Sequence, residues 1–113
     1  MNERRLESRF LCADLVRVTW SMVHGSNRTA DAVLEDISHV GGCVQVEEPI
    51  PVGVPIQLSI GEWSFAGHVS YCNYRDYGYF VGIRFSTESA WSSEQVVPQH
   101  LINLQNLSRQ GHA

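Results

Sequence analysis

Between Asp14 and Phe85 the sequence consists of short runs in which apolar and polar residues alternate, separated by turn-forming residues. A period of two places successive side chains on opposite faces of a β-strand, so that one face can be buried and the other solvated. The runs that we interpret as strands are 14–20, 29–37, 43–46, 56–60, 63–72 and 79–85. Six strands at such short, regular intervals predict an all-β fold, a small antiparallel barrel.

Three of these runs also indicate which side chains fill the barrel, because residues two apart share a face of a strand. The sets that share one face are Val16, Val18 and Trp20; Trp63, Phe65, Val69 and Tyr71; and Tyr79, Val81, Ile83 and Phe85. We expect the last set to point inward, and Trp63 could either line the barrel or cover a loop. Most of these side chains are large or β-branched, as is usual for strands that cover a hydrophobic core.

The hydrophobic period changes towards the C-terminus. Val97, Leu101 and Leu104 recur at spacings of four and three residues, which is typical of an amphipathic helix. We therefore predict a helix over 92–108 that docks over an opening of the barrel. A chain of 113 residues is large enough for one hydrophobic core and too small for two, so we predict a single domain over 1–113.

The N-terminal residues 1–11 are mostly polar and charged, and they include Arg4, Arg5 and Arg9. With few apolar anchors, this arm should be flexible until a ligand binds it. Arg5 and Arg9 are four residues apart, and their guanidinium groups could grip the oxygens of a phosphate bidentately. The alternative is that the arm is simply solvated, as charged N-terminal segments usually are.

A second polar cluster follows the run 29–37. Asp36 and Ser38 are two residues apart, so both can face the same way, and Gly41 and Gly42 can adopt positive φ or let a backbone or ligand come close. Such a platform would suit a planar base that carries donors and acceptors on its edge. The alternative is an ordinary strand end, at which Asp and Ser satisfy a turn and Gly occupies a positive-φ site.

The composition argues against several classes of protein. A net charge of −4 and a pI near 5.6 do not match the basic face of proteins that bind DNA or RNA polymers. The three cysteines are widely spaced, and neither they nor the five histidines show a disulfide or metal-site pattern. There is no nucleophile elbow, and a P-loop is impossible without Lys. We therefore expect no enzymatic activity, no metal and no cofactor.

The ends of the sequence also suggest where the protein acts. The charged start, Met1 to Arg5, is followed by no apolar stretch of the kind found in signal peptides. No apolar run approaches the length needed to span a membrane. We therefore expect a cytoplasmic protein that does not insert into membranes.

Taken together, these motifs resemble those of PilZ domains. Arg5-Leu6-Glu7-Ser8-Arg9 matches the RxxxR motif of that family, and Asp36-Ile37-Ser38-His39-Val40-Gly41 matches its [D/N]xSxxG motif, in the family's order. Gly82-Ile83-Arg84-Phe85 is similar to the last barrel strand of PilZ domains. The resemblance covers essentially the whole chain. It implies a six-stranded PilZ-type barrel with a C-terminal helix that binds the bacterial second messenger cyclic di-GMP.

The resemblance also implies a role for each motif residue. Arg5 and Arg9 would hold the phosphates and guanine faces of the ligand, and Asp36 and Ser38 would take the guanine edge and the adjoining backbone. Gly41 would leave room for the ligand. A carboxylate can accept from guanine N1–H and N2–H₂, and arginines can donate to guanine acceptors, so the residue types suit these roles.

Arg4 occupies a position at which a basic residue, in this family, tends to accompany binding of a stacked ligand dimer. The mechanism that we expect is non-enzymatic: the anionic ligand clamps the arm against the Asp36 platform and changes the surface offered to an unidentified downstream protein. The protein could be a monomer or a homodimer. The alternative function is a PilZ-like protein–protein adaptor that does not bind cyclic di-GMP, although such domains generally lack the motif residues that this chain retains.

Overall fold

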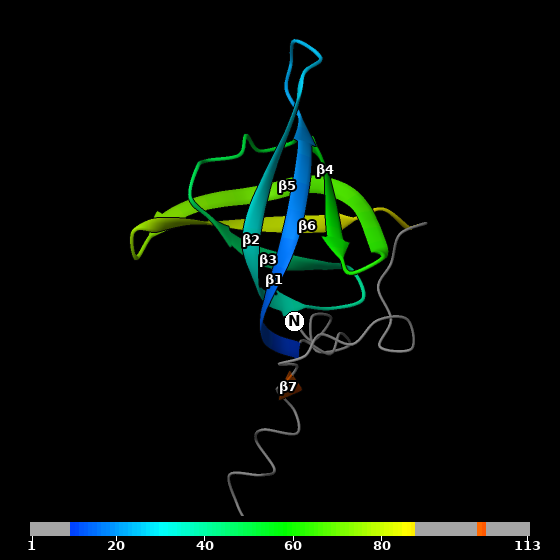
Figure 1. Ribbon diagram of the computed structural model, residues 1–113, viewed down its shortest axis with the longest axis vertical. Coiled ribbons are helices and arrows are strands. Elements are labelled where there is room, and N and C mark those ends of the chain that lie inside the picture. The colour runs from blue at the N-terminus through cyan, green and yellow to red at the C-terminus, as the bar shows by residue number, and fades with distance from the viewer. Residues whose placement is uncertain (1–9, 88–101, 104–113) are drawn as a thin grey trace, which may run out of the picture.

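The computed structural model describes residues 10–87 and 102–103, and the elements that lie wholly within them are β-strands (Figure 1). The strands are β1 (Phe10–Ser21), β2 (Asn27–Ile37), β3 (Gly41–Val46), β4 (Pro55–Ile60), β5 (Trp63–Arg75), β6 (Gly78–Phe85) and β7 (Ile102–Asn103). The six strands predicted from alternation are therefore confirmed as β1 to β6. Most of them extend beyond the predicted bounds, because the hairpin ends continue the pairing into residues that do not alternate.

The six long strands close into an antiparallel barrel. Their order in the sheet is β2-β3-β6-β5-β4-β1-β7, and an additional pairing between β2 and β1 joins the two sides. Closure leaves no unpaired edge among β1 to β6, which is how small barrels avoid strand addition by other chains. Two hairpins extend from the barrel in Figure 1, β1–β2 at the top and β5–β6 at the left.

Alternation correctly predicted the inward face of β1 and most of that of β6. The buried core cluster includes Val16, Val18, Trp20, Leu34, Ile37, Val44, Val46, Ile50, Ile56, Leu58, Ile60, Phe65, Val69, Val81, Ile83 and Phe85. Tyr79 is partly buried and packs against this cluster. The Phe65 and Phe85 rings stack with their centroids 5.5 Å apart, so β5 and β6 meet through aromatic contact inside the barrel.

The prediction that Trp63, Phe65, Val69 and Tyr71 share one face was wrong at Tyr71, and Trp63, whose place was left open, is exposed. Trp63 and Tyr71 are 42% and 41% exposed. Trp63 is the first residue of its strand, next to the turn from β4. Tyr71 follows an irregularity in the β5–β6 register between Val69 and Tyr71, and a bulge of this kind reverses which face the following side chains occupy. Cys72 packs against the core instead of Tyr71.

Only parts of the predicted N-terminal arm and C-terminal helix can be compared with the structure. Residues 1–9 of the arm predicted over 1–11 lie outside the described residues, and Phe10 and Leu11 are not arm but the first residues of β1. Most of the helix predicted over 92–108 also lies outside them. Within that range Ile102–Asn103 is described, and it forms the short strand β7, which pairs with Leu11 and Phe10. In the part of the chain that is described, no helix is long and apolar enough to cross a membrane.

Candidate functional site

The connection between β2 and β3 is a tight turn organised by Ser38. The Ser38 backbone N–H donates to the Gly41 carbonyl oxygen at 2.8 Å. The Ser38 hydroxyl donates to the same oxygen at 3.4 Å and accepts from the Val40 N–H at 3.3 Å. Ser38 is only 6% exposed, so its hydroxyl closes the turn from within. The turn role that we set out as the alternative for this serine is therefore present in the structure.

The two glycines after the turn are required for close packing and not for positive φ. Neither Gly41 nor Gly42 has positive φ, so that expectation was wrong; the described glycines that do are Gly25, Gly53 and Gly61. A Cβ on Gly41 would lie 2.2 Å from the carbonyl oxygen of Ile83, in the neighbouring strand β6. The close approach of a backbone, the other property that we expected of these glycines, is confirmed, because any side chain at Gly41 would separate β3 from β6.

Asp36, Ser38 and Gly41 line one hollow on the outside of the barrel, with a volume of about 330 Å³. This volume is at the lower end of those typical of small-molecule sites. The floor is a row of cross-strand neighbours, in which Asp36 pairs with Cys43, Cys43 with Gly82, and Gly82 with Tyr71. The structure thus brings together three of the six site residues predicted from the sequence.

Sequence reasoning missed two side chains that line the same hollow, Tyr71 and Arg84. The Tyr71 ring covers Gly82 so closely that a Cβ there would lie 2.1 Å from Tyr71 Cε2. Arg84 is exposed on β6 and pairs with Gly41. The outward position of Arg84 between inward Ile83 and Phe85 could have been recognised from alternation. The outward position of Tyr71 could not have been recognised in this way, because it depends on the bulge in β5.

The thiols near this hollow are held in their neutral form. Burial raises the pKa of Cys43, and the carboxylates of Asp36 and Glu35 raise it further, while a hydrogen bond with Tyr71 and the charge of Arg75 act in the opposite direction. Burial, together with the charges of Asp14, Asp36 and Glu35, raises the pKa of Cys12 to about 12. The thiolate is the reactive form of cysteine, so these two residues are poorly suited to act as nucleophiles.

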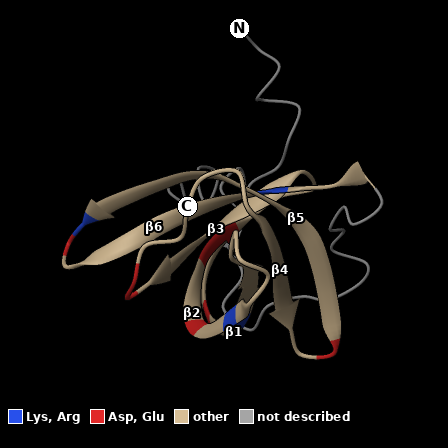
Figure 2. Ribbon diagram, turned by 90° about the horizontal axis from the view of Figure 1, so that it is seen from above, with Lys and Arg blue, Asp and Glu red and all other residues tan. Residues whose placement is uncertain are grey.

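Among the described residues, acidic positions outnumber basic ones. Figure 2 shows them in red along β2 and at the hairpin ends, with few basic positions in blue. Around the hollow itself, Asp36 supplies a negative charge and Arg84 a positive one. All three cysteines are described and none forms a disulfide. The described residues contain no group of three or more His, Cys, Asp or Glu side chains that could hold a metal ion.

The other three predicted site residues, Arg4, Arg5 and Arg9, lie outside the described residues. The start of β1 nevertheless shows where the described chain enters the barrel. Phe10 pairs with Ile37, and Leu11 pairs with Asp36, so β1 begins beside the Asp36–Gly41 turn. Consecutive Cα atoms are about 3.8 Å apart, and Arg9 is the residue directly before Phe10. The described chain therefore enters the barrel, at Phe10, beside residues that line the hollow.

Comparison with known proteins supports the fold. No family model matches the sequence, and no curated protein matches it. Among solved structures, the chain is similar to the PilZ domain with c-di-GMP of YcgR from Escherichia coli, with a TM-score of 0.52 and 17% sequence identity. The similarity covers 69% of this chain and 75% of that one. This protein therefore has the fold of a PilZ domain, as the motifs predicted.

Proposed function

We propose that this protein is a receptor for cyclic di-GMP that works by binding and not by catalysis. The observation that carries the proposal is the hollow that gathers Asp36, Ser38 and Gly41 beside a strand whose first residue follows Arg9. The PilZ-like structure of YcgR contains c-di-GMP, which supports the same ligand here. In this proposal Arg4, Arg5 and Arg9 complete the site from the N-terminal arm.

The side chains around the hollow suit the parts of such a ligand. The Asp36 carboxylate would accept hydrogen bonds from the N1–H and N2–H₂ groups of a guanine. Tyr71, which is half-exposed at the edge of the hollow, offers an aromatic face on which a base can stack. Ser38 would act through the turn that it closes, by holding the backbone of residues 38–41 in place.

The charge balance explains why the arm would be needed. Cyclic di-GMP carries two phosphates, whereas Arg84 is the only described arginine that lines the hollow, and Asp36 offsets its charge. Arg5 and Arg9 would supply bidentate contacts to the phosphates, and Arg4 would add charge for a second ligand molecule. Binding would then order the arm and change the surface available to a downstream protein, as a shift in population.

Calorimetric titration of the full chain with cyclic di-GMP tests this function. We expect Arg5→Ala and Asp36→Ala each to weaken binding by about tenfold to a hundredfold, because each removes a charge-assisted hydrogen bond. Arg17→Ala is the matched control, since Arg17 pairs with Asp31 at 3.2 Å outside the hollow. Absence of any binding heat with the native protein would reject the receptor function and leave the adaptor. Binding that persists undiminished in Arg5→Ala would reject the site.

Hydrogen exchange tests the proposed switch separately. We expect the backbone amides of residues 2–9 to exchange more slowly when the protein is saturated with cyclic di-GMP, because an ordered arm protects its amides. Unchanged exchange at saturation would show that the ligand binds without ordering the arm.

A further inference from the structure

A second hollow, of about 380 Å³, lies on the outer surface of β1, β2 and β3, and its lining includes Leu15, Val33, Gln45, Glu47 and Tyr77. The pairing of residues between neighbouring strands determines which side chains lie side by side at this hollow. Leu15 pairs with Val33, Val33 with Gln45, and Gln45 with Phe80. Paired residues of antiparallel strands project to the same side, so these side chains form a continuous row across four strands.

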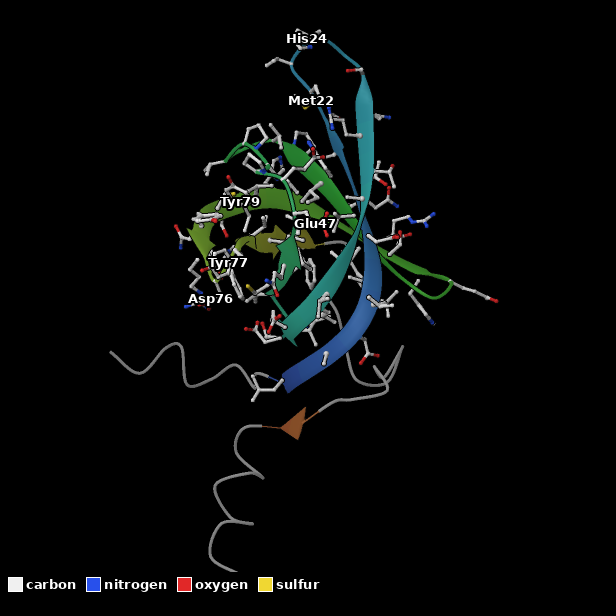
Figure 3. All side chains as sticks on the ribbon, turned by 60° about the vertical axis from the view of Figure 1, so that its left-hand side comes forward. Met22, His24, Glu47, Asp76, Tyr77 and Tyr79 are labelled. Carbon is white, nitrogen blue, oxygen red and sulfur yellow. The ribbon has the colours of Figure 1, made fainter. Side chains whose placement is uncertain are left out.

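Exposed apolar side chains border this hollow. Leu15 is 80% exposed and lies on the solvent face of β1, which it shares with the polar residues Arg17 and Thr19. Tyr77 is 95% exposed and lies at the tip of the β5–β6 hairpin (Figure 3). One exposed apolar residue is ordinary, but a leucine and a tyrosine around one hollow are typical of a binding surface.

The backbone that presents Tyr77 is strained. The two residues of the β5–β6 turn, Asp76 and Tyr77, have φ values of 55° and 64°. Turns of this kind favour Asn-Gly because only small residues adopt positive φ without penalty. A tyrosine at the second position is unfavourable for the turn, and its ring gains nothing from burial in return. Strain of this sort points to a role for the side chain outside the fold itself.

The wall of the hollow is acidic. Asp31 and Glu47 line it, and they also line an adjoining hollow together with Glu48, while no arginine lines either one within the described residues. Asp31 and Glu48 each have an exposed arginine partner, Arg17 at 3.2 Å and Arg28 at 2.9 Å. Such exposed pairs are weak and can be exchanged for other cations. Glu47 forms no ion pair with any described residue.

We propose that this surface, which we call the Leu15–Tyr77 face, binds a segment of a partner protein that combines aliphatic and basic side chains. An aliphatic side chain would lie between Leu15 and Tyr77, and a Lys or Arg would contact Glu47 and Asp31. A second copy of this chain fits less well. A twofold interface places the same patch on both subunits, so the two acidic walls would face each other.

The Leu15–Tyr77 face lies directly beside the candidate ligand hollow. Gln45 and Phe80 are two residues along their strands from Cys43 and Gly82, which lie in the floor of that hollow. Both surfaces therefore occupy the same side of the barrel. The proposal needs no ligand, so its test is independent of cyclic di-GMP binding.

The test uses the full chain and a fluorescent peptide of alternating Lys and Leu. Peptides of the same length that alternate Glu and Leu, or Lys and Ser, separate the basic from the aliphatic contribution. By fluorescence anisotropy, we expect the Lys-Leu peptide to bind at least about tenfold more tightly than either control. In ¹⁵N-labelled protein, it should shift the amide resonances of residues around Leu15, Gln45 and Tyr77.

Variants locate the binding surface. Leu15→Ser and Glu47→Lys should each weaken binding of the Lys-Leu peptide by about tenfold. Val23→Ser is the matched control, because Val23 is 91% exposed but lies in the β1–β2 turn, outside this face. Tyr77→Gly should also weaken binding while the midpoint of unfolding stays equal or rises, because glycine relieves the positive φ. That result would separate a loss of contact from a loss of folding.

Several outcomes would overturn the proposal. Equal binding of the Lys-Ser peptide would reduce the interaction to charge alone, and equal binding of the Glu-Leu peptide would remove the role of the acidic wall. Amide shifts confined to another part of the barrel would place the site elsewhere. Sedimentation that shows a dimer of the native chain, absent in Leu15→Ser, would assign the face to a second copy.

Discussion

Two neighbouring hollows on one side of this barrel are built in opposite ways. The lining of the Asp36 hollow includes three glycines, and a buried serine closes the turn at its rim. The Leu15–Tyr77 face has exposed large side chains, one of them on a strained turn. The first suits a small rigid ligand that must approach the backbone, whereas the second suits a flexible segment that contacts side chains. In the two functions that we propose, such closely spaced sites would let one domain receive a signal and meet a partner.

The largest expected effect is a loss of stability when Gly41, which lines the Asp36 hollow, is substituted. Gly41→Ala places a Cβ 2.2 Å from the Ile83 carbonyl oxygen, in the backbone of β6. Because that backbone is held in the barrel, we expect the free energy of unfolding to fall by about 3 kcal/mol.

Chemical denaturation measures this loss, and Gly25→Ala is the control. Gly25 has a φ of +90° but no atom within 4 Å of the added Cβ, so its substitution should cost only about 1 kcal/mol. If both substitutions lowered the free energy of unfolding by the same amount, β3 and β6 could separate to admit the added Cβ at Gly41 without an extra loss of stability.

The next largest effect should be a selective loss of binding at one surface while binding at the other is kept. Asp36→Ala should weaken cyclic di-GMP binding by about tenfold to a hundredfold and leave binding of the Lys-Leu peptide unchanged, and Leu15→Ser should do the reverse. Calorimetry and anisotropy on the same two variants measure both affinities. If either substitution weakened both interactions alike, the two hollows would have to be regarded as one site.

Alkaline pH should destabilise the folded protein through Cys12. The pKa of Cys12 is raised from 9.0 to about 12, so the folded state holds a proton that the unfolded state releases. The stabilisation is fully present below pH 9.0 and is lost as the pH rises towards about 12. Over that interval we expect the free energy of unfolding to fall by up to about 1 kcal/mol per pH unit.

Denaturant unfolding at a series of pH values measures this slope, with Cys12→Ala as the comparison. The variant should show a shallower decrease with pH. The same slope in both proteins would assign the pH dependence to groups other than Cys12.

A smaller, stabilising effect is expected at the second surface. Tyr77→Gly removes the positive-φ strain of the β5–β6 turn, and we expect a gain of about 1 kcal/mol in the free energy of unfolding. Tyr74→Gly is the control, because Tyr74 lies within β5 and its ring is 5.1 Å from that of Tyr79, so its loss should destabilise. A loss of stability in Tyr77→Gly would show that the ring supports the hairpin.

The smallest effect should be that of Leu15→Ser on stability. Since Leu15 is 80% exposed, we expect a change within about 0.5 kcal/mol. A thermal unfolding scan beside the native protein checks this. A large decrease would mean that Leu15 supports the fold, and that its exposure does not indicate a binding role.

Much of the fold could be predicted from the sequence because alternation is a local property. Val16, Val18 and Trp20 are buried as the period of two required, and all six strands of the barrel were identified. Alternation failed at Tyr71 because a bulge depends on how β5 pairs with β6. Nothing in the order of residues 63–72 indicates where such a pairing slips by one position.

The candidate site was predictable in its chemistry but not in its full membership. Asp36, Ser38 and Gly41 were chosen as a motif, and they line one hollow. Arg84 and Tyr71 join them only because β6 lies beside β3 in the barrel and β5 lies beside β6. The role of Arg4, Arg5 and Arg9 stays a prediction, supported by the start of β1 next to Asp36.

By itself the sequence determined the strands, the polar turn after β2 and the resemblance to PilZ domains, since all of these depend on residues close together in the chain. Only the tertiary structure decided why Gly41 must be glycine, which side chains share the Asp36 hollow, and that Leu15 and Tyr77 border a second one. Those properties arise from contacts between strands far apart in sequence, and they exist only once the barrel has closed.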